Sequence, residues 1–481
     1  MQSAGSSESD LPRIERIHII GICGVATGSL AGMLQAKGYR VTGSDRDVYP
    51  PMSTQLERLG IPILPGFSPE HLDPPPDLVI VGNVASRRNP EVVAVMERGI
   101  PYLSMPEALA RFFLGAGTSI VIAGTHGKTT TSALAAWMLE AAGLDPGFMI
   151  GGIVKNFGKS YKIGGGSYFV TEGDEYDTAF FDKGPKFLHY RPRIGIVTSI
   201  EFDHADIFPD FEAVEGAFAR FIDLLPPEGR LIVAHEDPTI AALLPRSHAP
   251  VLSYGLAGEA DYVADEIEIG PEMTHFLVRE RDRPLLTIET PLFGLHNVRN
   301  ALAVIAMARQ LEIPLPTIEQ AMATFAGVAR RQEVRGVVRG VTVIDDFAHH
   351  PSAIRETIGA VRRKYAGRRL FAVFEPRSNT TRRNVFQEAF VEAFSWPGVA
   401  VVIADLFSPE KIPPPERLCV ERLVQDLQAR GIHARHIPTA DRIVETLARE
   451  TRAGDVVLIM SNGGFDDIHR KLLTALEGEA P

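Results

Sequence analysis

The sequence predicts an α/β protein of three domains, and three observations lead to this fold class. The chain has 481 residues, which is enough for several hydrophobic cores. Two glycine-rich turns each follow an apolar strand and begin a helix. The last third of the chain contains several apolar strands that end in polar or glycine-rich residues. We expect a Rossmann-like domain at 14–115, a central domain with a mostly parallel sheet at 116–328, and a second Rossmann-like domain at 329–481.

Composition restricts the partners and the compartment. The net charge is -11 and no basic stripe occurs along the chain, which argues against a nucleic-acid partner. The two cysteines, Cys23 and Cys419, form no disulfide or metal-binding pattern, and this favours a reducing compartment. Residues 1–10 do not look like a signal peptide, and no apolar run reaches membrane-spanning length. We therefore expect a cytoplasmic protein without membrane contact.

The first glycine turn follows the apolar run Ile17–Ile20. Its glycines are Gly21, Gly24 and Gly28, and a second strand ends near Asp45. The dinucleotide-binding fingerprint requires a glycine at position 23, where this chain has cysteine, so the fingerprint fails. A related diphosphate can still bind such a turn at the helix N-terminus. The alternative is a Rossmann-type scaffold that binds no ligand.

The second turn, GTHGKT (124–129), follows a strand at 118–123 and begins a helix. Backbone N–H groups and the helix dipole favour phosphate at such a position. Lys128 can reach the β- and γ-phosphates of a nucleotide, and the Thr129 hydroxyl can bind Mg²⁺. Two residues separate the glycines where the general P-loop pattern has four, so this turn is a shortened variant. The alternative is a structural turn with an incidental lysine.

Two further strand ends carry candidate metal ligands. Glu172 ends the run YFVTE, and its carboxylate suits Mg²⁺ in a phosphate site. His204 follows the run IVTSIEFD and is a less usual ligand, so it can also be an ordinary loop histidine. We expect the acidic neighbours Asp174, Glu175 and Asp177 to form a solvated face.

Later motifs add polar groups from a helix and from the third domain. Asn297 and Asn300 lie three residues apart, so their amides share one helix face and can bind an adenine or ribose edge or cap the helix. The runs RRQE (330–333) and IDDFAHHP (344–351) begin the third domain. The tandem histidines of the second run lack partner cysteines or carboxylates at metal spacing, which argues against zinc.

Taken in order, these motifs resemble the Mur ligase family, the ATP-dependent amide ligases of bacterial peptidoglycan metabolism, over nearly the whole chain. The resemblance implies ATP and Mg²⁺ as cofactors. It implies ATP contacts at Gly124, Thr125, His126, Gly127, Lys128, Thr129, Thr130, His296, Asn297, Asn300, Arg331 and Asp346. It implies metal ligands at Thr129, Glu172 and His204, and catalytic roles for Lys128, His204 and Arg331. An aromatic residue is common in the family where this chain has Gln332.

The first glycine turn acquires a role from the same resemblance. Family members that act on UDP-N-acetylmuramic acid hold the UDP group in a Rossmann-like N-terminal domain, and GICG, TGSD and NVASRRNPE resemble its elements. The implied UDP-sugar contacts are Gly21, Gly24, Gly28, Ser44, Asp45 and Ser86. Two glycine turns would then serve two nucleotides, with ATP at the central turn and the UDP-sugar at the first.

Two activities in the family use this acceptor, and the sequence favours one of them. The stretches VYPPMSTQLE, EGDEYDTAFFDKGPKFLHYRP, FEPRSNT and MSNGGFDDIH resemble members that join the tripeptide L-Ala-γ-D-Glu-meso-diaminopimelate to UDP-N-acetylmuramic acid through an acyl phosphate, in peptidoglycan recycling. The alternative activity adds L-alanine, and those members have a shorter segment after the magnesium glutamate. Arg377 and Asn379 are candidate contacts in the third domain, and the alternative is that they cap the loop. We expect a monomer or a weak dimer.

Two classes outside ligation compete with this interpretation. A P-loop NTPase without a covalent acceptor would use the central turn but would leave the first domain without a function. A nicotinamide oxidoreductase built on residues 16–45 is disfavoured by the broken fingerprint.

Overall fold

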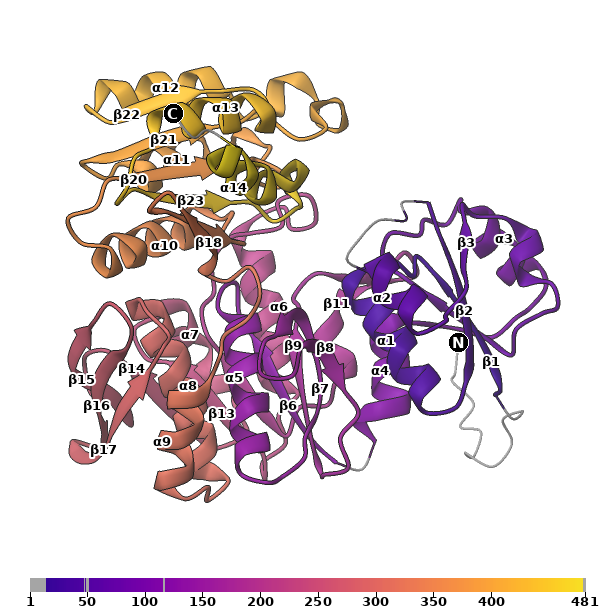
Figure 1. Cartoon of the computed structure of the whole chain (residues 1–481). Coiled ribbons are helices and arrows are strands. Elements are labelled where there is room, and N and C mark those ends of the chain that lie inside the picture. Colours follow the sequence, from indigo (N-terminus) through magenta and orange to yellow (C-terminus); the bar gives the residue numbers. More distant parts are fainter. Residues whose placement is uncertain (1–13, 47, 49–51, 116, 479–481) are drawn as a thin grey trace.

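The computed structural model describes residues 14–46, 48, 52–115 and 117–478, and it contains three α/β domains (Figure 1). The predicted fold class is confirmed, because each domain is built around its own parallel or mostly parallel sheet. Residues 49–51 of the VYPPMSTQLE stretch, residue 116 and residues 479–481 of the expected third domain lie outside the described residues. Among the described helices, none is both long enough and apolar enough to span a bilayer.

The N-terminal sheet has five parallel strands in the order β3-β2-β1-β4-β5. The strands are β1 (Arg16–Ile20), β2 (Arg40–Asp45), β3 (Ile63–Pro65), β4 (Leu78–Val81) and β5 (Tyr102–Ser104). The α-helices are α1 (Val25–Ala36), α2 (Met52–Arg58), α3 (Pro90–Glu97) and α4 (Met105–Leu109). The first glycine turn joins β1 to α1, so it lies at the carboxyl edge of the sheet, where open α/β sheets bind ligands.

The central sheet has ten strands in the order β17-β16-β15-β14-β13-β12-β6-β9-β7-β8. Strands β15, β16 and β17 pair antiparallel, and so do β7 and β8. The strands are β6 (Thr118–Ala123), β7 (Gly147–Val154), β8 (Lys159–Lys162), β9 (Tyr168–Gly173), β12 (Ile194–Val197), β13 (Arg230–Ala234), β14 (Val251–Gly255), β15 (Tyr262–Ile269), β16 (Thr274–Glu280) and β17 (Arg283–Thr290). The helices are α5 (Lys128–Ala141), α6 (Phe211–Asp223), α7 (Pro238–Leu243), α8 (Leu295–Gln310) and α9 (Leu315–Thr324).

The C-terminal sheet has six strands in the order β18-β19-β23-β20-β21-β22, and all pairs except β18–β19 are parallel. The strands are β18 (Glu333–Val338), β19 (Val341–Asp346), β20 (Leu370–Phe374), β21 (Val399–Ile403), β22 (His433–His436) and β23 (Val456–Met460). The helices are α10 (Pro351–Lys364), α11 (Gln387–Phe394), α12 (Val420–Ala429), α13 (Ala440–Glu450) and α14 (Ile468–Gly478).

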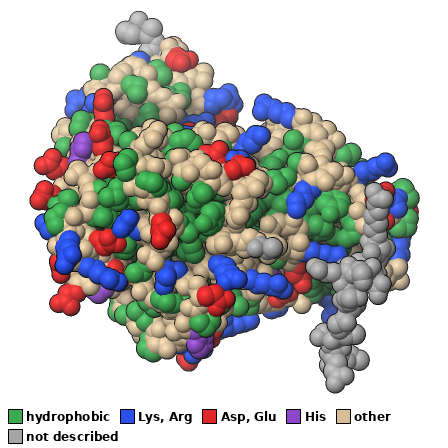
Figure 2. Space-filling model, turned by 90° about the horizontal axis from the view of Figure 1, so that it is seen from below, with side chains coloured by type: hydrophobic (Ala, Val, Ile, Leu, Met, Phe, Trp, Pro, Cys, Tyr) green, Lys and Arg blue, Asp and Glu red, His purple; other side chains and the backbone are tan. Residues whose placement is uncertain are grey.

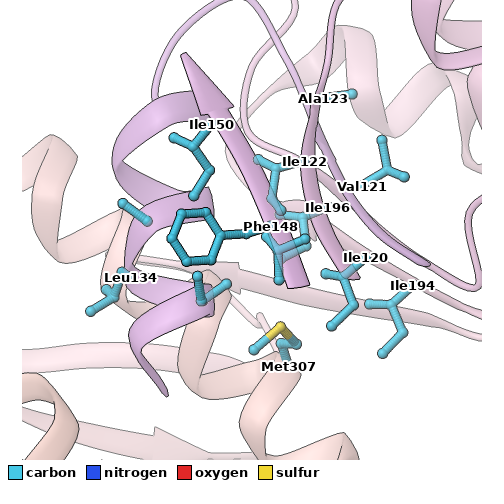
Figure 3. Packing of buried hydrophobic residues seen from close by; sticks show 14 of the residues in the cluster. Ile120, Val121, Ile122, Ala123, Leu134, Phe148, Ile150, Ile194, Ile196 and Met307 are labelled. Atoms are coloured by element: carbon cyan, nitrogen blue, oxygen red, sulfur yellow. The ribbon is translucent and has the colours of Figure 1, made fainter. Parts of the chain in front are cut away.

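The core of the central domain fixes the phosphate turn. Ile120 and Ile122 of β6 and Ile196 of β12 are fully buried and pack with Leu134 of α5 and Phe148 of β7 (Figure 3). Strands buried on both faces must be apolar throughout, which explains the continuous apolar runs at these positions. Because β6 and α5 are both anchored in this core, the turn between them has a fixed geometry.

The N-terminal domain is joined to the central domain by a shared core. Buried side chains of both domains form one continuous hydrophobic cluster, and α1 lies beside β7 and β8. A buried hydrogen bond of 2.9 Å joins the Ser29 and Ser160 hydroxyls. The Tyr161 ring lies directly against Gly32, where an added Cβ would collide with its hydroxyl. These contacts hold the two glycine turns in a defined relative position.

The surface is mixed in charge on the face seen in Figure 2. Lysine, arginine, aspartate and glutamate side chains alternate there, with apolar side chains between them. A mixed surface of this kind does not favour a polyanionic partner.

We predict that Gly32→Ala destabilises the protein, because its new methyl group must displace Tyr161 at the domain contact. Overpacking of this kind costs about 1–3 kcal/mol. Gly216→Ala is the matched control, since Gly216 lies in helix α6 with nothing near its Cβ position. It should gain about 0.5–1 kcal/mol from helix propensity. Chemical denaturation measures both changes. Because Gly32 also lies in a helix, α1, the control subtracts the gain in helix propensity, and equal midpoints for Gly32→Ala and Gly216→Ala would contradict the interface.

Candidate active site

A cavity of about 1200 Å³ lies where the three domains meet. Its wall includes both glycine turns, the strand ends after β9 and β12, the start of helix α8, and the first loops of the C-terminal domain. Most ligand sites in proteins have volumes of about 300–1,000 Å³. The cavity is therefore large enough for more than one substrate, and it joins the two turns in one continuous space.

The central glycine turn needs both of its glycines. Gly124 has a φ of 136° and Gly127 a φ of 80°, which favour glycine. A Cβ at Gly127 would lie 2.6 Å from the Asn300 side chain, and one at Gly124 would collide with Thr198. Gly127 precedes the first residue of α5, and no side chain caps this helix end. Its first amides are therefore free to bind an anion.

Lys128 is the buried cation of this turn. Its ammonium group donates to the Gly124 carbonyl at 2.5 Å and to Glu175 Oε2 at 3.1 Å. Burial alone would lower the pKa of Lys128, but Glu175, Asp174 and Glu172 together raise it above the ordinary lysine value. Lys128 therefore remains an ammonium group over the whole working pH range. Glu175 is only 3% exposed, so the expectation that it belongs to a solvated face is wrong.

The candidate metal ligands lie beside this turn. The Thr129 hydroxyl donates to Glu172 Oε2 at 3.0 Å, and Arg331 Nη2 donates to the Thr129 hydroxyl at 3.1 Å. Glu172 Oε1 accepts the Gly151 amide at 2.6 Å. Burial and the neighbouring Asp174 raise the pKa of Glu172. A nearby cation would relieve this cost, because it favours the ionised carboxylate.

His204 enters the same cavity from the loop after β12. Its φ of 55° is unusual for a residue other than glycine, which indicates that the surrounding structure holds it in a strained backbone conformation. Its Nε2 lies 3.6 Å from Glu175 Oε1, and its ring packs on Tyr176 with centroids 4.6 Å apart. His204 is thus linked to Lys128 through Glu175, a residue to which the sequence reading gave no role.

The candidate ATP contacts on α8 and in the C-terminal domain form one polar network. Asn300 donates to Asn297 at 3.1 Å, and Asn297 donates to Gln332 at 3.2 Å. The backbone amide of Gln332 donates to Asp346 Oδ2 at 2.7 Å. His296 Nε2 lies 3.4 Å from the Gln332 side chain. Gln332 therefore connects α8 to the C-terminal domain.

Asp346 holds the loop that follows β19. One oxygen accepts from the Gln332 amide and the other from the Ala348 amide, both at 2.7 Å. Burial raises the pKa of Asp346, although Arg331 acts in the opposite direction. Asp346 and Arg331 both line the cavity, and Arg331 lies over the Phe347 ring at 4.7 Å.

The first glycine turn contributes fewer of its predicted residues to the cavity. Gly21 and Gly24 line it, whereas Gly28, Ser44, Asp45 and Ser86 are not among the described residues of its wall. Ser44 donates to the buried Glu91, and Asp45 accepts the Cys23 amide at 2.9 Å. Gly28 packs against Met52 inside the domain. Wall residues that the sequence reading missed include Thr27, Asn83, Val84, Tyr176, Lys186 and Tyr190.

A third cluster joins the central and C-terminal domains. Ligand atoms of His126, Glu201 and His350 lie within 4.8 Å of one another. His350 is already engaged on both sides, because its Nε2 lies 3.1 Å from the Phe202 carbonyl and its Nδ1 accepts the Ser352 amide at 3.3 Å. Burial opposes the ionisation of Glu201, but its contacts with His126 and Ser352 lower its pKa to about 2. We interpret this cluster as an interdomain contact.

Comparison with known proteins identifies the class. Residues 16–115 match the catalytic domain of the Mur ligase family, residues 122–308 match the Mur ligase middle domain, and residues 330–463 match the glutamate ligase domain of Mur ligases. The chain belongs to the Mur ligase family.

Individual relatives cover almost the whole chain. The UDP-N-acetylmuramate–L-alanyl-gamma-D-glutamyl-meso-2,6-diaminoheptandioate ligase of Escherichia coli is 40% identical over 97% of this chain and 99% of its own length. The UDP-N-acetylmuramate–L-alanine ligase of an Anaeromyxobacter species is 35% identical over 97% of this chain and 98% of its own.

Solved structures agree with this assignment. The murein peptide ligase of Psychrobacter arcticus is 35% identical, with a TM-score of 0.73 over 97% of this chain and 100% of that chain. UDP-N-acetylmuramate-alanine ligase from Thermotoga maritima has a TM-score of 0.79 over 97% of this chain and 99% of that chain, and at 22% identity it shows the shared fold.

We predict that His350 makes stability pH-dependent. Burial and the neighbouring His126 lower the pKa of His350 from 6.5 to about 4, so the unfolded chain binds its proton first as the pH falls. Stability is therefore lost between pH 6.5 and 4, and the loss at pH 5 is about 2 kcal/mol. Denaturation at pH 7 and pH 5 should show a smaller difference for His350→Gln than for the wild type.

The exposed His248 provides the control for this measurement. His248→Gln should keep the pH dependence of the wild type. An unchanged dependence in His350→Gln would contradict a neutral, buried His350.

Proposed function

We propose that this chain is an ATP-dependent ligase that joins the tripeptide L-Ala-γ-D-Glu-meso-diaminopimelate to UDP-N-acetylmuramic acid. The observation that carries this proposal is the single cavity of about 1200 Å³ that both glycine turns line. A phosphate turn with a buried, permanently charged lysine suits ATP, and the first turn opens on the same space, where an acceptor can reach the γ-phosphate. We place the reaction in the cytoplasm because it consumes ATP.

The choice of amine is supported by the segment after Glu172. Residues 177–190 form a hairpin, β10 (Asp177–Ala179) and β11 (Asp182–Pro185), and the 3₁₀ helix η3 (Lys186–His189). The resemblance to Mur ligases implies that members that add L-alanine have a shorter segment here. The relative at 40% identity is named for the tripeptide, whereas the one at 35% is named for L-alanine. Addition of L-alanine is the second candidate.

A magnesium ion fits the residues beside the phosphate turn. The Thr129 hydroxyl and the Glu172 carboxylate are 3.0 Å apart and are hard oxygen donors, and the raised pKa of Glu172 favours a cation there. His204 would complete the set from the neighbouring loop. A bound divalent cation supplies positive charge against the phosphate oxygens.

The residues of this chain then have separate roles. In the first step a carboxylate oxygen of the acceptor attacks the γ-phosphorus, the bond from that phosphorus to ADP breaks, and an acyl phosphate forms. In the second step the amine attacks the acyl carbon, phosphate leaves and a proton is released. Lys128 cannot be the base, because its raised pKa keeps it protonated. It donates to the transferring phosphoryl group instead, and Arg331 assists from the C-terminal domain.

We predict amide formation and phosphate release only when ATP, Mg²⁺, UDP-N-acetylmuramic acid and the tripeptide are all present. Mass spectrometry of the product and a phosphate assay measure this. A product with L-alanine alone would assign the second candidate. Phosphate release without any acceptor would contradict ligation and indicate an NTPase.

Lys128→Ala should lower the rate of product formation by at least about a thousandfold, since it removes the charge-stabilising donor. Lys159→Ala is the matched control, because Lys159 lies exposed on β8 of the same domain, and it should keep the wild-type rate. A Lys128→Ala rate within tenfold of wild type would exclude the assigned role.

We predict that Glu172→Gln raises the Mg²⁺ concentration needed for half-maximal rate by about tenfold or more, because a neutral amide binds the ion less well. Titration of MgCl₂ at saturating substrates measures this. Glu212→Gln, at an exposed position on α6, should leave the midpoint unchanged. Equal midpoints for Glu172→Gln and the wild type would remove Glu172 from the metal site.

A further inference from the structure

The segment from Asp174 to Tyr190 connects the N-terminal domain to the phosphate turn. Phe180, at the tip of the β10–β11 hairpin, packs against the buried cluster of the N-terminal domain. Phe181 forms an edge-on contact with Tyr102 of β5, with ring centroids 5.0 Å apart. Helix η3, which follows the hairpin, lies against α4 of the N-terminal domain. The segment is therefore fixed at both its tip and its end.

Lys186, the first residue of η3, is a buried lysine that lines the cavity. It is 7% exposed, and its ammonium group lies 3.0 Å from Asp174 Oδ2 and 4.0 Å from the centre of the Tyr176 ring. Lysine is rarely buried unless its charge is paired. Lys183 of the same hairpin differs, because its side chain is 68% exposed and pairs with Asp177 at the surface.

The two partners of Lys186, Asp174 and Tyr176, each interact with a residue of the proposed active site, Lys128 or His204. Asp174 accepts a hydrogen bond from the Lys186 ammonium group and also interacts electrostatically with Lys128. The Tyr176 ring has Lys186 near one side and contacts the His204 ring at 4.6 Å. The described contacts of the Lys186 ammonium group are with Asp174 and Tyr176, not with Lys128 or His204. Its influence on them passes through Asp174 and Tyr176.

We propose that Lys186 is a positioning residue that neutralises Asp174 and holds Tyr176, and thereby keeps Lys128 and His204 in place for phosphoryl transfer. The proposal deepens the ligase function given above and rests on it. A buried carboxylate without a partner is costly, and without Lys186 the Asp174 carboxylate would attract the Lys128 ammonium group more strongly, because the two groups already interact electrostatically. Lys128 would then be displaced from the phosphate. A displacement of about 1 Å at such a group can lower a rate by a hundredfold.

The first test compares three lysine variants at saturating substrates. Lys186→Met should lower kcat by about 10- to 100-fold and change the KM values for ATP and the acceptor by less than about threefold. Lys186→Arg keeps the charge and should retain kcat within about fivefold of the wild type. Lys183→Met should match the wild type. Equal losses in Lys186→Met and Lys186→Arg, or a Lys186→Met kcat within twofold of wild type, would overturn the proposal.

The second test separates positioning from direct substrate contact. Asp174→Asn removes the carboxylate that Lys186 neutralises. In the Asp174→Asn background, adding Lys186→Met should slow the reaction by less than about threefold, since the pair acts as a unit. A full 10-fold or larger loss in both backgrounds would mean that Lys186 acts on the substrate itself, and it would overturn the positioning role. Melting temperatures, measured alongside, confirm that each variant is folded.

The wild-type assay keeps the two proposals distinguishable. If the wild type releases phosphate from ATP but forms no amide, the ligase function fails. The kcat ratios between the variants and the wild type are then measured from the rate of phosphate release. If the wild type forms the amide and the lysine variants do not follow the expected order, the positioning role alone fails.

Discussion

The cavity depends on one constraint: the buried carboxylates around the central glycine turn must be neutralised by buried cations. The carboxylates are Glu172, Asp174 and Glu175, and the cations are Lys128, Lys186 and Arg331. Each would cost several kcal/mol if buried alone, roughly as measured for unpaired interior ions. The three cations come from α5, from η3 and from the loop before β18. The balance therefore exists only when the hairpin segment and the C-terminal domain are both in place, and the site cannot form from the central domain alone.

The domain contacts divide this assembly into a fixed part and a separable part. The N-terminal and central domains share one hydrophobic cluster and the buried Ser29–Ser160 hydrogen bond. The C-terminal domain has separate clusters, one of which also includes Phe293 of the central domain, and polar contacts such as Ser352 with Glu201 and Asn379 with Asp206 complete that interface. An interface with many polar contacts separates more easily than one continuous apolar core. The two glycine turns are thus fixed relative to each other, whereas Arg331, which contacts Thr129, belongs to the C-terminal domain.

The sequence predicted the features that depend on local spacing. The fold class was confirmed, because strand periodicity and turn residues are local signals. The burial of Glu175 was not predictable, since it accompanies contacts with Lys128 and His204, which come from distant parts of the chain. Ser44 was expected to contact the UDP-sugar, yet its hydroxyl donates to Glu91, 47 positions away in the chain. Lys186 carries no sequence motif, and only its burial against Asp174 distinguishes it from Lys183.

The two glycine turns differ in what they offer an anion. In the first turn, the amides of Gly21 and Ile22 donate to the Ser44 carbonyl and that of Cys23 donates to Asp45. Only the first amides of α1, which have no partner within the helix, remain for a ligand. Gly127 begins α5 without a side-chain cap and with Lys128 next to it. The central turn therefore combines amides with a permanent positive charge, as a transferring phosphoryl group requires. The first turn offers amides without a lysine beside them, and in the proposed reaction it would hold a diphosphate that is not transferred.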